Sequence, residues 1–201
     1  MGDLNKRNYV LVLDSSGSMG EPVSRTNKTS RWHFAQEATV AVARKCAELD
    51  SDGIDVYTFN KKFKKFANTT PEKVAEIFNT VEPMGGTSFT EVMEDVFETH
   101  FAGDKPTTVL VVTDGCPSDG VVGQQALAKL LVKTANRLEG DAELGVEFIQ
   151  IGEDPTAHEF LKKLDDDLVS AGSKFDIVDT KTMEDLDGMS ITDVLLAAVN
   201  D

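Results

Sequence analysis

Short, almost continuously apolar runs with strand preference recur along the chain, separated by segments with helical periodicity. The runs occupy residues 8–13, 54–59, 107–113, 146–151 and 174–178. A strand without polar alternation is expected to be buried on both faces, as in the centre of a parallel sheet. Strands that alternate with helices therefore predict an α/β fold with a mainly parallel sheet.

The segments between these runs predict the helices. Apolar residues at helical spacing, together with capping and stop signals, place helices at 31–48, 71–78, 88–101, 121–137, 156–168 and 183–199. Phe63 and Phe66 lie among the lysines of segment 61–66, which is predicted to form an antiparallel edge strand whose charges discourage aggregation. A basic docking patch is the alternative for that segment.

Size and charge narrow the class of protein. A chain of 201 residues with 40% apolar content can bury one substantial core, and no linker or repeat divides it, so we expect a single domain over residues 1–201. The net charge is −15. A surface of that charge repels phosphate, so we expect neither a nucleic acid nor a membrane as a partner.

Features that would direct the chain out of the cell are missing from the sequence. The residues before the first strand are polar, and no apolar run approaches the length of a membrane span. Cys46 and Cys116 are too few for a disulfide framework and match no zinc motif. We therefore expect a cytoplasmic protein with reduced thiols.

Oxygen-bearing side chains gather at three points where strands end or helices begin. Asp14, Ser16 and Ser18 follow the first strand, Thr87 follows a double glycine, and Asp114 follows the strand at 107–113. Ligands bind at the carboxyl ends of strands in open α/β sheets. Two carboxylates and three hydroxyls, completed by waters, suit a divalent cation, with Mg²⁺ favoured and Mn²⁺ or Ca²⁺ possible. Zinc is disfavoured, because the set contains no His or Cys.

Each of these residues also has an ordinary structural interpretation. Asp14 and Ser16 are common in turns that end strands, and Asp114 with its following glycine is a common turn pair. Thr87 could simply cap a helix, and Thr90 is a nearby competitor for the same metal role. The metal interpretation depends on all the segments occurring together.

Asp14-x-Ser16-x-Ser18, Thr87 and Asp114, in this order, resemble the metal-ion-dependent adhesion site (MIDAS) of the von Willebrand factor A (VWA) domain. The resemblance extends to the order of strands and helices over nearly the whole chain. It implies a doubly wound, Rossmann-like, mainly parallel sheet with strand order 3-2-1-4-5-6, one antiparallel edge strand and helices on both faces. In similar domains the serines bind the ion directly, the carboxylates act mostly through water, and the threonine moves in or out.

An open coordination position on such an ion indicates the function. A Glu or Asp of a partner protein would complete the shell through a charge-assisted bond. The sequence thus predicts an intracellular, metal-dependent protein-interaction module and no enzyme. Intracellular relatives of this architecture commonly act in multi-subunit assemblies, often with ATPases, and no nucleotide-binding P-loop is present here.

Two other functions remain as alternatives. A Mg²⁺-dependent phosphatase or phosphotransferase also begins with an aspartate after the first strand, but its usual second aspartate is Ser16 here. In a structural subunit, the metal would only rigidify loops.

Three further features lie near the predicted site. Asp119 either hydrogen-bonds to a metal ligand or influences partner choice, or it is a solvated loop residue. Cys116 is expected to be unreactive, because an acidic rim raises the pKa of a thiol. The polar segment 21–30 is expected to form a rim loop over the site.

Overall fold

A six-stranded sheet organises the molecule, which we describe from a computed structural model covering residues 7–49, 53–182 and 193. Its order is β3-β2-β1-β4-β5-β6, with β3 antiparallel to β2 and all other neighbours parallel. The strands are β1 (Asn8–Asp14), β2 (Ile54–Phe59), β3 (Phe63–Thr69), β4 (Thr107–Thr113), β5 (Leu144–Gln150) and β6 (Val178–Lys181). The fold and strand order expected from the resemblance are confirmed.

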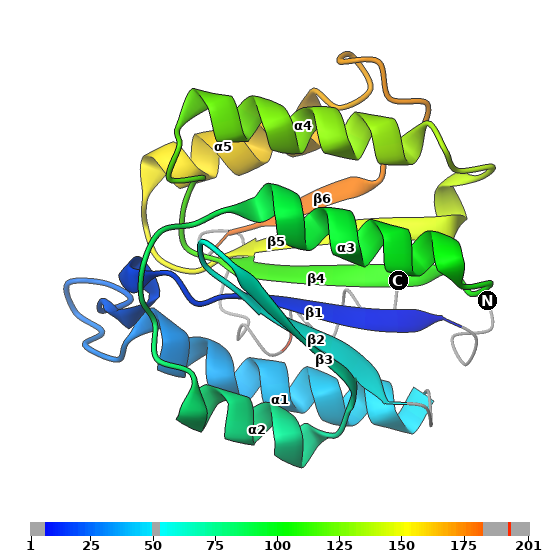
Figure 1. The fold of residues 1–201 in the computed structure, drawn as a ribbon. Helices are drawn as coiled ribbons and strands as arrows, with labels where there is room; N and C mark the ends of the chain where they lie inside the picture. The colour runs from blue at the N-terminus through cyan, green and yellow to red at the C-terminus, as the bar shows by residue number, and fades with distance from the viewer. Residues whose placement is uncertain (1–6, 50–52, 183–192, 194–201) are drawn as a thin grey trace.

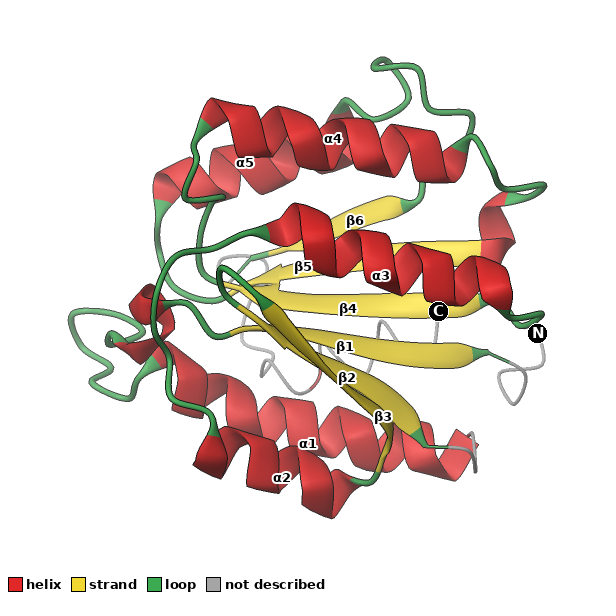
Figure 2. Ribbon diagram, in the orientation of Figure 1, coloured by secondary structure: helices red, strands yellow, loops and turns green. Residues whose placement is uncertain are grey.

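Helices cover both faces of the sheet (Figure 1). On one face lie α1 (Arg31–Leu49) and α2 (Pro71–Thr80), and on the other lie α3 (Phe89–Ala102), α4 (Val121–Ala135) and α5 (Pro155–Asp166). Two short 3₁₀ helices, η2 (Gly17–Gly20) and η3 (Asp141–Glu143), lie in loops. Figure 2 shows the three resulting layers, with the strands between two layers of helices.

The two faces of the strands build two separate cores. In β1, Val10 and Val12 pack toward α3, α4 and α5, whereas Tyr9, Leu11 and Leu13 pack toward α1 and α2. All five side chains are at least nine-tenths buried. Continuous apolar strands are therefore needed here, because both faces are covered.

The elements between the strands lie close to their predicted positions. Thr70 caps α2 by accepting a hydrogen bond from the backbone of Lys73 at 3.4 Å, and Pro71 occupies the first turn. On α1, Ala38, Val42 and Cys46 are fully buried. Capping residues and helical periodicity thus located these helices correctly.

Two predictions differ from the structure or lie outside it. The last strand was expected at 174–178, but β6 spans Val178–Lys181, and only Val178 among these four residues is buried. As an edge strand, β6 carries polar residues, while the apolar residues before it pack in the preceding loop. The predicted helix at 183–199 lies outside the described residues apart from Asp193.

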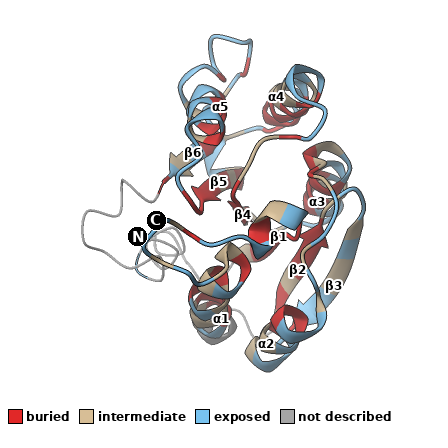
Figure 3. Cartoon of the chain, turned by 90° about the vertical axis from the view of Figure 1, so that its left-hand side faces the viewer, coloured by how far each residue is buried: buried red, intermediate tan, exposed pale blue. Residues whose placement is uncertain are grey.

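Figure 3 looks onto the end of the sheet where β1 and β4 terminate, with η2 lying across that end. The loops after both strands meet here, at the point where the chain turns from one side of the sheet to the other. None of the helices in the described part of the chain is long and apolar enough to span a bilayer.

Candidate metal site

The site begins where β1 ends in a fully buried aspartate. Both Asp14 carboxylate oxygens have donors: the backbone N–H of Ser16 at 2.8 Å and the Thr113 hydroxyl at 2.7 Å. The Ser15 hydroxyl points elsewhere and donates to the backbone carbonyl of Phe59 at 2.9 Å. Ser15 thus ties the loop to β2, which leaves Asp14 and Ser16 on the side that faces β4.

A chain of hydroxyls connects this loop to β4. The Ser16 and Ser18 Oγ atoms lie 3.2 Å apart, and the Ser18 hydroxyl donates to Asp114 Oδ1 at 3.0 Å. Ser16 and Asp114 are almost completely buried, and Ser18 is half-buried. The structure therefore brings four of the five predicted ligands, Asp14, Ser16, Ser18 and Asp114, into one cluster.

The fifth predicted ligand, Thr87, belongs to a segment that contacts the serine loop through backbone hydrogen bonds. The Gly17 N–H donates to the Gly85 carbonyl at 3.0 Å, which joins the double-glycine segment to the serine loop. Gly85 has a φ of +76°, a left-handed conformation that favours glycine. Thr87 is buried, and within the described residues its hydroxyl makes no hydrogen bond to the other four predicted ligands. Thr90, its competitor, lies in the first turn of α3.

Ser118 holds Thr87 in place and was not singled out by the sequence. The Thr87 N–H donates to Ser118 Oγ at 2.7 Å, and the Ser118 N–H donates to the Thr87 carbonyl at 2.9 Å. Ser118 follows Asp114 by four residues. The loop after β4 therefore carries one predicted ligand and positions another.

A second residue missed by the sequence analysis supplies the positive charge of the cluster. Arg31, at the start of α1, places Nη1 2.5 Å from Asp114 Oδ2 and 3.3 Å from the Ser18 carbonyl. The two side chains in this ion pair are 17% and 0% exposed. The sequence offered no signal for this contact, because an arginine at a helix start is ordinary.

Burial dominates the electrostatics of the two carboxylates. Loss of hydration raises the pKa of Asp14 to about 6, with the negative charge of Asp114 adding to the shift. Burial also raises the pKa of Asp114, while Arg31 opposes that change. Two like charges held close together in a dry environment form a place where a cation would be stabilised.

The chemistry of the donors fits a small divalent cation. Neighbouring oxygens in an octahedral Mg²⁺ shell lie about 3.0 Å apart. The Ser16–Ser18 and Ser18–Asp114 oxygen distances are 3.2 and 3.0 Å. Across residues 7–49 and 53–182, no three His, Cys, Asp or Glu side chains form a metal-binding group. An ion at this place would therefore depend on the serine and threonine hydroxyls.

Two other residues near the site have different surroundings. Asp119 is exposed, and its carboxylate lies so close to Gly123 in the first turn of α4 that a Cβ there would collide with Oδ1. The Asp119 carboxylate therefore lies against the start of α4. The pKa of Cys116 is raised, first by burial and then by the charge of Asp154. The direction agrees with the expectation from the sequence, but the main cause is burial and not the acidic rim.

The rim loop, residues 21–30, borders the site. Its ends pair through Pro22 and Ser30, and the Arg31 N–H donates to the Glu21 carbonyl at 2.9 Å. A cavity of about 390 Å³ lies beside it, lined by residues of the loop together with Arg31, Glu153 and Asp154. The rim loop is therefore connected to the cluster through Arg31.

Comparison with known proteins identifies the family. The sheet order, the helical layers and the strand-end cluster together define a VWA-type α/β domain. The chain belongs to the vWA-TerF-like family, described as the vWA found in the TerF C terminus, which matches residues 6–196. No curated protein matches the chain.

Solved structures share this fold at low sequence identity. A mutant of the PilB minor pilin from Streptococcus sanguinis matches with a TM-score of 0.72 and 11% identity, over 97% of this chain and 61% of that one. A von Willebrand factor type A protein from Catenulispora acidiphila gives 0.58 and 16%, over 96% and 42%. The human COPII-coat protein Sec24c gives 0.57 and 11%, over 96% and 32%. The chain thus spans less than two thirds of each of these proteins.

Proposed function

We propose that this VWA domain is a protein-interaction module that captures an acidic side chain of a partner through a divalent cation. The ion, Mg²⁺ in the first place, would be held by Asp14, Ser16, Ser18, Thr87 and Asp114. The observation that carries this proposal is the line of oxygens from Ser16 through Ser18 to Asp114, with spacings of 3.2 and 3.0 Å that suit an octahedral shell. Asp14 joins this line through the Ser16 N–H.

The chemistry of the site supports capture by coordination. When bound, the ion would supply Lewis acidity, because hydroxyl ligands add no charge to it. The protein's own groups hold the ligand oxygens in place: the Ser16 N–H and Thr113 hydroxyl fix Asp14, and Arg31 fixes Asp114. A partner Glu or Asp would bind through a charge-assisted contact in a partly dry site. We propose that no bond is broken.

The proposal extends to the setting of the module. Within the described residues, neither Cys46 nor Cys116 forms a disulfide, which supports a cytoplasmic protein. A domain that catalyses no reaction would act within a multi-subunit assembly, in which an ATPase could supply energy from ATP hydrolysis. The net charge of −15 supports a protein partner over a nucleic acid or an anionic membrane.

Direct cation binding tests the first half of the proposal. Mn²⁺ titrated into the protein and followed by electron paramagnetic resonance should bind one tight site per chain. Asp114→Ala should abolish that site, whereas Asp119→Ala removes a carboxylate from the same loop and should leave it intact. Equal Mn²⁺ binding by Asp114→Ala and the wild type would refute the assigned site.

Affinity capture from a native lysate tests the second half. Partner capture should disappear with EDTA and in Asp114→Ala, and should persist in Asp119→Ala. The two alternatives predict different results. Turnover of generic phosphate esters with Mg²⁺, lost in Asp14→Asn, would identify an enzyme. Capture that survives EDTA while the melting temperature falls would identify a structural ion.

A further inference from the structure

Arg31 brings a fixed positive charge into the oxygen cluster. Its guanidinium contacts the Asp114 carboxylate at 2.5 Å and the Ser18 carbonyl at 3.3 Å, so it touches two of the three chain segments that build the site. Asp114 is its one ion-pair partner within the described residues. In the described part of the chain, no other carboxylate pairs directly with Arg31, although Glu153 and Asp154 line the same cavity.

Neighbouring groups pack closely around the Arg31 side chain and hold it in this position. Gly152 lies against the guanidinium with a φ of +97°, and a Cβ there would lie 2.9 Å from Arg31 Nε. Arg31 Nε is buried and, among the residues that the structure describes, has no hydrogen-bond partner. A buried, unpaired N–H is costly, so packing against Gly152 and pairing with Asp114 hold the side chain there despite that cost.

A count of charges shows what this arrangement does. Asp14 and Asp114 contribute two negative charges when ionised, and Arg31 returns one positive charge. A divalent cation would then leave the cluster with a net charge of about +1, which one carboxylate from outside would neutralise. Without the arginine, the same cation would already be neutralised by the two aspartates.

We propose that Arg31 is a positioning residue with a fixed charge, which weakens binding of the bare divalent cation and strengthens binding of a carboxylate to the loaded site. This inference rests on the proposed function, because it concerns the same cation and the same acidic partner. Arg31 prevents the ion from being satisfied by the protein alone, so that the complete site needs the partner's carboxylate.

The sign of the effects separates this role from a purely structural one. If Arg31 only held Asp114 in place, its removal would weaken binding of both the cation and the carboxylate. A charge role requires the two affinities to change in opposite directions. At separations of a few ångströms and an effective dielectric constant near 20, one charge changes each affinity by about tenfold or more.

Mn²⁺ and acetate are suitable probes for this test. Mn²⁺ affinity is measured by electron paramagnetic resonance, and acetate affinity by the loss of Mn²⁺-bound water in water-proton relaxation. Both are measured at pH 8, above the pKa of about 6 of Asp14. Arg31→Met should bind Mn²⁺ at least about tenfold more tightly than the wild type and acetate at least about tenfold more weakly.

Two further variants serve as controls. Arg31→Lys keeps the charge and should remain within about threefold of the wild type for acetate, although it loses the planar geometry of the guanidinium. Arg25→Met removes a charge from the rim loop, where the described structure shows no contact with Asp114, and should leave both affinities unchanged.

The outcomes distinguish this inference from the proposed function. A wild-type protein that binds no Mn²⁺ would refute the proposed function itself. A wild type that binds Mn²⁺, together with an Arg31→Met variant whose two affinities are unchanged or both weakened, would overturn the role of Arg31 alone. If Arg31→Met does not fold, Arg31→Gln takes its place, and loss of the fold in both would show a structural residue and overturn the proposal.

Discussion

Polar side chains are buried at both ends of the neighbouring strands β1 and β4, but the two ends differ in the partners that these side chains have. At the carboxyl ends, Asp14 and Asp114 place two like charges in a region where they are 0% and 2% exposed. At the amino ends, the His100 ring shares a hydrogen bond with the Thr107 hydroxyl at 2.9 Å. The carboxyl end holds two buried carboxylates and one arginine, whereas the amino end pairs its groups with neutral partners.

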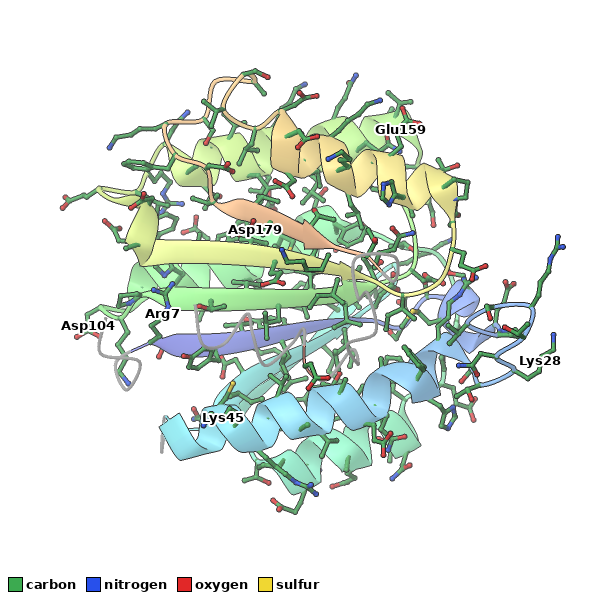
Figure 4. The ribbon with its side chains drawn as sticks, turned by 180° about the vertical axis from the view of Figure 1, so that it is seen from behind. Arg7, Lys28, Lys45, Asp104, Glu159 and Asp179 are labelled. Carbon is green, nitrogen blue, oxygen red and sulfur yellow. The ribbon has the colours of Figure 1, made fainter. Side chains whose placement is uncertain are left out.

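The arginine at the amino end, Arg7, is also paired with neutral groups. It donates to the Thr108 hydroxyl at 3.0 Å and to two backbone carbonyls, at 3.0 and 3.3 Å, so its contacts join β4 to the loop before β5. In Figure 4, Arg7 lies at one end of the strands and Lys28, on the rim loop, lies at the other. Groups matched by neutral partners stabilise a fold, whereas gathered like charges reduce stability and mark a binding site.

The largest expected effect comes from removing the hydroxyls at the carboxyl end. Ser16→Ala combined with Ser18→Ala should weaken Mn²⁺ binding about a thousandfold or more, because even residues behind the metal ligands change affinity by 10–100-fold. The melting temperature without metal should remain within a few degrees of the wild type. Equilibrium titration and thermal unfolding in EDTA measure the two quantities. If the double variant kept the Mn²⁺ affinity of the wild type, the hydroxyls at the carboxyl end would not be metal ligands, and this end would not differ from the amino end in cation binding.

The pH dependence of stability should have opposite signs at the two ends. The pKa of Asp14 is raised from 3.8 to about 6, so the folded state holds a proton that the unfolded state has lost. In EDTA, stability should therefore fall as pH rises from about 4 to about 6, by about 3 kcal/mol from this group. Burial lowers the pKa of His100, so its contribution is lost as pH falls below 6.5.

Matched variants separate these two contributions. Urea unfolding of Asp14→Asn between pH 4 and pH 7 should lack the decrease due to Asp14, and His100→Gln should lack the loss on the acidic side. A pH profile of Asp14→Asn that parallels the wild type would show that Asp14 is not the group responsible.

Substitution of Arg7 should affect the fold and leave cation binding unchanged. Arg7→Met removes three hydrogen bonds at the amino end and should lower the free energy of unfolding by about 2 kcal/mol. Its Mn²⁺ affinity should remain within about twofold of the wild type. Arg25 is an exposed arginine on the rim loop, so Arg25→Met is the control for loss of charge alone. A large change in Mn²⁺ affinity in Arg7→Met would show that the two ends are coupled.

The strands could be predicted because burial on both faces leaves an unbroken apolar run. The central strands β1, β2 and β4 carry such runs, and their predicted bounds agree with the structure to within one residue. The strand β6 could not be placed in this way, because an edge strand pairs on one side only and tolerates polar residues. Ile177 precedes it and is buried in a loop, so the apolar signal falls ahead of the strand.

The oxygen-bearing residues of the candidate site could be predicted from the sequence, but the residues that position them could not. Asp14, Ser16 and Ser18 form a local pattern that can be read directly from the sequence. Arg31 lies 83 residues from Asp114, and Ser118 lies 31 from Thr87, so neither contact leaves a local signal. Thr87 and Asp114 were found from their places at a helix start and a strand end, and the family resemblance favoured Thr87 over Thr90. It named no residue that positions them.

The smallest expected effect concerns Ser118, because its side chain contacts the site through one backbone group, the Thr87 N–H. Ser118→Ala removes the acceptor for the Thr87 N–H but keeps the bond from its own N–H to the Thr87 carbonyl. The loss of one hydrogen bond is worth about 1 kcal/mol, so Mn²⁺ affinity should fall about three- to fivefold. Thr90→Val, in the first turn of α3, should leave the affinity unchanged. If Thr90→Val weakened Mn²⁺ binding and Ser118→Ala did not, Thr90 would replace Thr87 as the fifth ligand, and the double-glycine segment would serve only to connect the loops.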